Sequence, residues 1–173
     1  PNLNQHHLLM MMPSTPFDDE RKFAAAALAA ILGGGVGSRF HWALVDKGLA
    51  DEASASVDIH DGYGEQIVWA TCSPENAEEV ATVMRKEMSS VSASLTQVDL
   101  DKVKAKAATE VAIQNERPSG SMQRLGAMLT TSGTFISLAE QLEKIESLTI
   151  KNLQDVTEAF PWSPLFEAST TSE

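Results

Sequence analysis

Four histidines are the residues with which this sequence could hold a metal ion. A helical zinc site needs two histidines four residues apart, with a glutamate beside them to activate water. His6 and His7 are adjacent in a strand-like run, so their side chains point to opposite faces. Neither His41 nor His60 has a histidine four residues later, and neither H-x-x-E-H nor H-E-x-x-H occurs. We therefore expect no metal ligand in this chain.

A mixed cluster surrounds His60, where Asp58, Asp61 and Glu65 could bring oxygens and one nitrogen together. The cluster spans a turn, where Asp is common because its side chain bonds the local backbone and Gly is common because it adopts positive φ angles. A solvated polar turn is the interpretation that we favour over a metal site.

Nucleophilic chemistry has little support in this sequence. Cys72 is the single cysteine, and it lies in an apolar strand-like run, where a cysteine usually packs as a small buried hydrophobe. One cysteine also excludes an internal disulfide. No G-x-S-x-G motif is present, so we expect no catalytic residue in this chain.

The glycine-rich run at 33–38 could bind a phosphate, but its context argues against that. A phosphate-binding loop follows a strand and ends in Gly-Lys-Ser/Thr, whereas this run follows an Ala-rich helix and precedes Arg39. The dinucleotide fingerprint fails as well, because Phe40 stands where its third glycine should be. The glycines fit a helix–glycine–helix connection with positive φ angles. Their N–H groups could still bind a peptide carbonyl or carboxylate.

The elements that position this loop can be predicted from local patterns. Residues 5–12 form an apolar run that predicts a strand ended by Pro13 and Pro16. Thr15 and Pro16 then predict a helix start, and the Ala-rich helix should continue to the glycines. A second, shorter helix is expected over 38–47.

The middle of the chain predicts a β-hairpin. Apolar and polar residues alternate over 53–60, residues 61–64 form a turn, and residues 65–71 return as the partner strand.

The remainder is mainly helical. One helix is expected to open at Ser73, with its apolar stripe at Ala77, Val80, Met84 and Met88. Another opens at Thr96 with a capping box, its stripe being Leu100, Val103, Ala107 and Val111, and a break follows at 115–120. Further helices are expected around 121–132, 135–146 and 150–159, then a short strand at 165–168 and a polar tail at 169–173. Locally paired strands separated by runs of helices indicate the α+β class.

Composition bounds the classes of protein to consider. The 173 residues predict a single domain, 1–173, with an ordered core of about 4–169. The formal net charge is −11, which disfavours nucleic acid as a partner. No apolar stretch reaches the 18 residues or so that a membrane span requires. A soluble protein of the bacterial cytoplasm or periplasm is expected.

The order of several short motifs resembles the C-terminal domain of the insulinase/pitrilysin zinc peptidases. The motifs are Leu32-Gly33-Gly34-Gly35, Gly37-Ser38-Arg39-Phe40, Lys47-Gly48-Leu49-Ala50, Ser73-Pro74-Glu75-Asn76, the helix from Asp99 to Lys106, and the segment from Ile145 to Leu153. Together they cover nearly the whole chain.

This resemblance implies a fold and a role. The fold would be one half-domain of the LuxS/processing-peptidase-like metallohydrolase fold, an antiparallel sheet with helices packed on it. Two such halves close around a peptide, and the first half carries the H-x-x-E-H zinc site. The zinc is therefore expected in a partner half or subunit, with no cofactor in this chain. A peptide substrate is the other expected partner, and a homodimer is an alternative assembly.

The resemblance also implies a substrate contact at the glycine loop. The residues carried over are Gly34, Gly35, Gly37, Ser38 and Arg39. Pairing with an acidic neighbour is the favoured interpretation of Arg39, and binding of a substrate carboxylate is the alternative.

The sequence departs from the family at two positions. Many members have an arginine before and a tyrosine after the Gly-Leu-Ala segment, and here Val45 and Asp51 stand near those positions. Neither side chain can donate the hydrogen bonds that stabilise an oxyanion. The resemblance thus predicts the non-catalytic half of a zinc endopeptidase, inactive alone. The alternative is an inactive homologue that acts as a scaffold or peptide-binding subunit.

Overall fold

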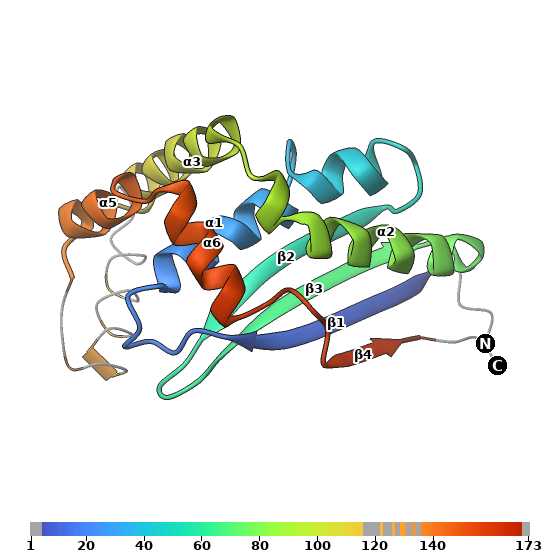
Figure 1. The fold of residues 1–173 in the computed structure, drawn as a ribbon, viewed down its shortest axis with the longest axis horizontal. Helices are drawn as coiled ribbons and strands as arrows, with labels where there is room; N and C mark the ends of the chain where they lie inside the picture. The colour runs from blue at the N-terminus through green and yellow to red at the C-terminus, as the bar shows by residue number, and fades with distance from the viewer. Residues whose placement is uncertain are drawn as a thin grey trace.

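A four-stranded antiparallel sheet forms the base of the molecule (Figure 1). The computed structural model describes residues 5–115, 122, 126, 129–130, 133 and 136–170. The strands are β1 (His6–Ser14), β2 (Glu52–Ile59), β3 (Gly64–Cys72) and β4 (Phe166–Ser169). Their order in the sheet is β2-β3-β1-β4, so the first and last strands of the chain lie side by side.

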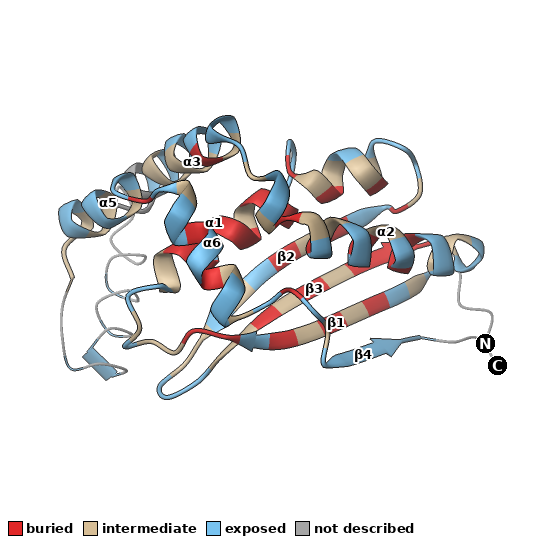
Figure 2. Cartoon of the chain, viewed as in Figure 1, coloured by how far each residue is buried: buried red, intermediate tan, exposed pale blue. Residues whose placement is uncertain are grey.

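The two faces of the sheet differ in burial. Leu8, Met10 and Met12 of β1 are buried, whereas Leu9 and Met11 are only half-buried. Side chains alternate between the faces of a strand, so one face is packed and the other is open. Figure 2 shows the resulting stripes of buried residues along the strands.

Helices cover the packed face in two tiers (Figure 1). The helical elements are α1 (Lys22–Gly33), η1 (His41–Val45), η2 (Pro74–Asn76), α2 (Ala77–Ser90), η3 (Ser92–Ser94), α3 (Gln97–Asn115), α5 (Leu138–Glu146) and α6 (Ile150–Ala159). Helix α1 packs on β2 and α2 packs on β1 and β3, while α3, α5 and α6 contact α1. The core between these layers includes the fully buried side chains of Phe40, Leu28, Leu32, Met84 and Leu153.

The α+β class and the antiparallel sheet are confirmed. The hairpin of β2 and β3 forms as expected, with Ala53 and Ala55 buried and Ser56 and Asp58 exposed. The short C-terminal strand also forms, and β4 pairs with β1.

The strand predicted over 5–12 was too short at its end, because β1 continues through Pro13 to Ser14. The N–H of Thr170 donates to the His7 carbonyl and that of Leu165 to the Met11 carbonyl. Alternate residues of a strand face the same neighbour, so Pro13 also faces the β4 side. The pairing with β4 ends at Met11, and the missing N–H of Pro13 therefore breaks no ladder bond.

The prediction that Thr15 opens the first helix was also wrong, since α1 begins at Lys22. The Asp19 carboxylate accepts a hydrogen bond from the Arg21 N–H at 2.8 Å, and this local bond competes with helix formation. Phe17 donates its N–H to the carbonyl of His60, which holds the segment as a turn against the hairpin.

The later helices that the structure describes lie close to their predicted ranges. Thr96 caps α3, and reciprocal capping boxes at Ser137 and Thr149 open α5 and α6. Helix α2 carries Val80, Met84 and Met88 as buried residues. Some predicted features lie outside the described residues. They are the break at 116–120, most of the helix expected over 121–132, the first residue of the helix expected over 135–146, and the end of the polar tail.

The helix expected at 38–47 is shorter than predicted, and its central turn is π-helical instead of α-helical. Residues 41–45 form a π-helical turn, in which the Asp46 N–H donates to the His41 carbonyl at 2.8 Å. Its buried anchor is Leu44, which packs into the core.

Candidate functional site

The glycine loop joins α1 to η1, and its glycines have different roles. Gly33 lies against β2, where a Cβ would be 2.1 Å from the Ala55 nitrogen. Gly35 and Gly37 have φ angles of +93° and +88°, which L side chains rarely adopt, and a Cβ there would meet open space. Gly33 therefore allows α1 to approach the sheet, while Gly35 and Gly37 shape an exposed loop.

Ser38 closes the loop from its far end. Its N–H donates to the Gly35 carbonyl at 3.0 Å, and its Oγ accepts a hydrogen bond from the His41 N–H at 3.3 Å. The side chain is buried, so its hydroxyl holds the loop in shape rather than facing solvent.

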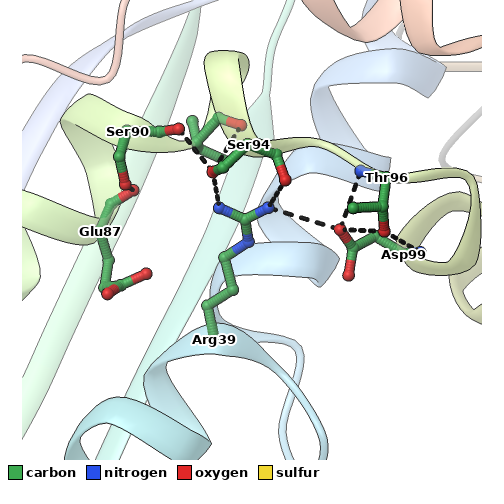
Figure 3. Close-up of polar contacts among 7 residues, drawn as sticks. Arg39, Glu87, Ser90, Ser94, Thr96 and Asp99 are labelled. Carbon is green, nitrogen blue, oxygen red and sulfur yellow. Dashed lines mark hydrogen bonds and ion pairs between the residues drawn. The ribbon is translucent and has the colours of Figure 1, made fainter.

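Arg39 is engaged by the chain itself (Figure 3). Its guanidinium donates to the Ser94 hydroxyl, to the Ser94 carbonyl at 2.8 Å and to the Asp99 carboxylate at 3.4 Å. The predicted pairing of Arg39 with an acidic neighbour is confirmed. Arg39 thus ties the glycine loop to the start of α3, and its contact with a substrate carboxylate stays a prediction.

Asp99 serves two partners at once. It accepts hydrogen bonds from the N–H and hydroxyl of Thr96 at 3.1 and 2.9 Å, and it receives the Arg39 guanidinium. Burial by itself raises the pKa of Asp99, but the bonds from Thr96 and the charge of Arg39 outweigh burial and hold the pKa below its ordinary value. Asp99 is therefore a stable anion that neutralises Arg39.

A shallow groove of about 390 Å³ runs between the glycine loop and α3. Its lining includes apolar and basic side chains together with one carboxylate, and comprises Ala30, Ile31, Gly34, Val36, Gly37, Ser38, Arg39, Trp42, Asp99, Lys102, Val103 and Lys106. Four of the five residues carried over from the family, all except Gly35, line this groove. The groove is therefore the candidate binding site that contains most of the residues carried over from the family.

Sequence reasoning did not single out Trp42, Lys102 or Lys106. The α3 residues of the groove are Asp99, Lys102, Val103 and Lys106, and their spacing of three and four residues places them on one helix face. That spacing was visible in the sequence, but nothing local indicated that this face lies opposite the glycine loop.

The hairpin tip brings three of its four candidate ligands together. His60 Nε2 lies 3.5 Å from an Asp58 oxygen and 3.9 Å from a Glu65 oxygen, while Asp61 stays outside the cluster. The His60 ring also stacks on Tyr63, with 4.6 Å between the ring centroids. The Asp58 side chain is 58% exposed, in keeping with the solvated turn expected from the sequence.

The positions of the family arginine and tyrosine offer no donor in this chain. Val45 packs against the core, and the exposed Asp51 accepts a weak hydrogen bond from the Gln5 side chain at 3.5 Å. Cys72 is buried, and this burial, with a smaller effect from the Asp51 charge, raises the pKa of its thiol. A raised pKa disfavours the nucleophilic thiolate.

Residues 1–107 match a family model described as the peptidase M16 inactive domain. The chain belongs to this family. The resemblance to the C-terminal domains of insulinase-like zinc peptidases is thereby confirmed. Among the helices of the described residues, none is long and apolar enough to cross a membrane.

Relatives of this M16 inactive domain are larger proteins. It is 28% identical, over 72% of its length, to an uncharacterized zinc protease of Mycobacterium bovis, and an uncharacterized zinc protease of Mycobacterium tuberculosis matches equally well. The matched region covers only 29% of either relative. This chain therefore spans less than a third of the length of these relatives.

Solved structures share the fold of the M16 inactive domain. A protease from Helicobacter pylori superposes with a TM-score of 0.86 at 19% identity, over 96% of this chain and 41% of that chain. The peptidase M16 inactive domain from Pseudomonas fluorescens gives 0.81 at 18% identity, over 95% and 40%. At these identities the likeness establishes the fold alone.

Proposed function

We propose that this domain is the non-catalytic half of a zinc metalloendopeptidase, and that it closes a peptide-binding chamber opposite a zinc-bearing half. The family and the names of its relatives as zinc proteases support this proposal. The histidines of the chain do not fit a catalytic zinc, because no pair of them has the spacing that a helical site needs. The zinc and its water-activating base therefore belong to the other half.

The open face of the sheet is the observation that carries the proposal. Across β1 and β3, Leu9 pairs with Trp69 and Met11 pairs with Ile67, and Phe166 of β4 lies beside Met11. We call these five residues the outer face. None of them is buried, and Phe166 is 54% exposed.

The described helices pack on the opposite side of the sheet, so they leave the outer face uncovered. A contiguous apolar patch of this kind marks an interaction surface, because exposing it to water costs free energy. The relatives contain more than twice as much chain as the matched region, and that additional chain is the natural cover.

A reconstitution experiment tests this function. The chain is mixed with the H-x-x-E-H half of the same protease, and hydrolysis of an unstructured peptide is measured. We expect no hydrolysis by this chain alone and restored, chelator-sensitive hydrolysis by the mixture. Hydrolysis by the chain alone, or no association between the halves, would contradict the proposal.

Charge placed on the outer face sharpens the test. Ile67→Lys puts an ammonium group into the proposed interface and should weaken association with the zinc half by at least about tenfold. Thr82→Lys is the matched control, because Thr82 is exposed on α2 at the opposite side of the sheet. Equal association of both variants would argue against the outer face as the interface.

A catalytically inactive scaffold or peptide-binding subunit is the second candidate function. It is favoured by Val45 and Asp51, which supply no hydrogen-bond donor where many family members have an arginine and a tyrosine. The same mixture separates the two functions. A scaffold predicts that the halves associate and bind peptide without hydrolysing it.

A further inference from the structure

We propose that the groove between the glycine loop and α3 binds a peptide carboxylate that lies next to an apolar residue. This inference rests on the proposed function and adds a substrate class to it, namely peptides that present a carboxylate beside an apolar residue. The ligand is held by loop N–H groups, by the ammonium of Lys102 and by the apolar surface of Val36 and Trp42.

The loop presents hydrogen-bond donors without acceptors. Among the described residues, the N–H groups of Val36 and Gly37, which line the groove, have no backbone or side-chain acceptor, and neither has that of the adjacent Gly35. The flanking N–H groups are bonded: that of Gly34 donates to α1 and that of Ser38 donates within the loop. Consecutive free N–H groups in a glycine loop favour an anionic oxygen. A carboxylate can accept several such bonds at once.

The charges of the groove favour an anion. Arg39 and Asp99 neutralise each other, and the Lys106 ammonium donates to the Gly34 carbonyl and lies 3.9 Å from Glu110. Lys102 is exposed and has no hydrogen-bond or ion-pair partner among the described residues. Lys102 is therefore the cation that is free to meet a ligand, in place of Arg39.

This basic character contrasts with the rest of the chain. The groove is lined by three cations and one carboxylate, whereas the whole chain has 24 acidic and 13 basic residues. The acidic surface repels an acidic peptide overall, whereas the excess of cations in this groove attracts one. Charge complementarity thus selects a carboxylate over an ammonium ligand.

Apolar residues flank the donors. Val36 is 89% exposed at the tip of the loop and Trp42 is 55% exposed on η1, and both line the groove together with Ile31 and Val103. Exposed valine and tryptophan beside a polar anchor provide a place for an apolar side chain. The preferred ligand is therefore an acidic residue, or a free C-terminus, beside leucine or a similar residue.

Binding of matched peptides tests the inference. The first probe is a short alanine-based peptide, capped at both ends, with leucine–glutamate–leucine at its centre, and the second replaces glutamate by glutamine. We expect the glutamate peptide to bind about tenfold more tightly, as one charge-assisted contact predicts. Its binding should weaken with added salt and shift the amide signals of Gly35, Val36 and Gly37 in NMR spectra.

A third probe separates the two sources of a carboxylate. It has glutamine at the centre and a free C-terminal carboxylate directly after leucine. Tighter binding of this probe than of its amidated form assigns the groove to chain ends, and tighter binding of the glutamate peptide alone assigns it to acidic side chains. Either outcome supports a carboxylate site, and equal binding of all the probes overturns it.

Two substitutions locate the site. Lys102→Glu should abolish the preference for glutamate over glutamine, whereas Lys151→Glu should preserve it. Lys151 is the matched control, because it is exposed on α6, has no described partner and does not line the groove. Trp42→Ala should weaken the glutamate and glutamine peptides to the same extent. An unchanged preference in Lys102→Glu would overturn the inference.

The failure of this inference differs from the failure of the proposed function. If all the probes bind equally, the carboxylate preference is wrong while the peptide chamber stands. If the chain fails to associate with a zinc-bearing half, the proposed function fails whatever the peptides do.

Discussion

Gly33 and Ala55 are in direct backbone contact, so a side chain on Gly33 would be 2.1 Å from the Ala55 nitrogen. This contact joins the C-terminal end of α1 to β2, and it sets the height of α1 above the sheet. Gly35, two residues later, has open space around it. The glycines of one motif thus divide into a packing role and a loop role.

Gly33→Ala should strongly destabilise the domain. The added methyl group meets the β2 backbone, which cannot move without disturbing the sheet, so we expect a loss of about 3 kcal/mol or more in the free energy of unfolding. Gly35→Ala is the matched control, where only the positive φ is penalised, by about 1 kcal/mol. Urea denaturation of both variants measures the difference, and equal losses would contradict the packing role of Gly33.

Arg39→Lys should destabilise the domain although it keeps the positive charge. Lysine cannot reproduce the forked bonds to Ser94 and Asp99, so we expect a loss of about 1–2 kcal/mol in the free energy of unfolding. Arg21→Lys changes a local, exposed pair with Asp19 and should cost less than about 0.5 kcal/mol. Thermal and urea denaturation check both values. A neutral Arg39→Lys would show that the network does not hold α3 in place.

Asp99 should contribute stability that depends on pH. Its pKa is lower in the folded chain than its ordinary value of 3.8, so the folded state favours the ionised form. This stabilisation is fully present above the ordinary pKa and is lost as pH falls through the lowered pKa. Asp99→Asn should therefore be less stable than the wild type near neutral pH, and the difference should shrink below about pH 4.

Urea denaturation across the acid range measures this effect. Asp101→Asn is the control on the same helix, since the Asp101 carboxylate accepts a single described hydrogen bond, from Gln97. A difference between wild type and Asp99→Asn that stays constant with pH would rule out the charged network as its origin.

Removal of metal ions should leave the stability of this chain unchanged. The described core is built from apolar side chains, and the sequence has no zinc-peptidase motif, so we expect the free energy of folding not to depend on zinc. The melting temperature should be the same with and without EDTA, while the reconstituted pair should lose its activity. A fall in melting temperature with EDTA would reveal a structural metal in this half.

Local patterns predicted most of the fold. The alternation over 53–60 and the capping signal at Thr96 are short-range features, and the structure contains the elements that they predict. The wrong boundaries at Pro13 and Thr15 have tertiary causes. The pairing of β1 with β4 stops before Pro13, so the proline does not end the strand. The His60 carbonyl binds the N–H of Phe17, so the segment after Thr15 is held as a turn. Neither boundary was therefore decided by nearby residues alone.

The sequence by itself determined that this chain lacks the zinc-peptidase motif, because ligands that chelate from one helix need a fixed local spacing. It also determined the glycine loop and an acidic partner for Arg39. Only the tertiary structure decided that this partner is Asp99, 60 residues away, and that Lys102 lies beside the loop without a partner among the described residues. Helix periodicity fixes which residues share a face, whereas packing of the helices on the sheet decides what that face meets.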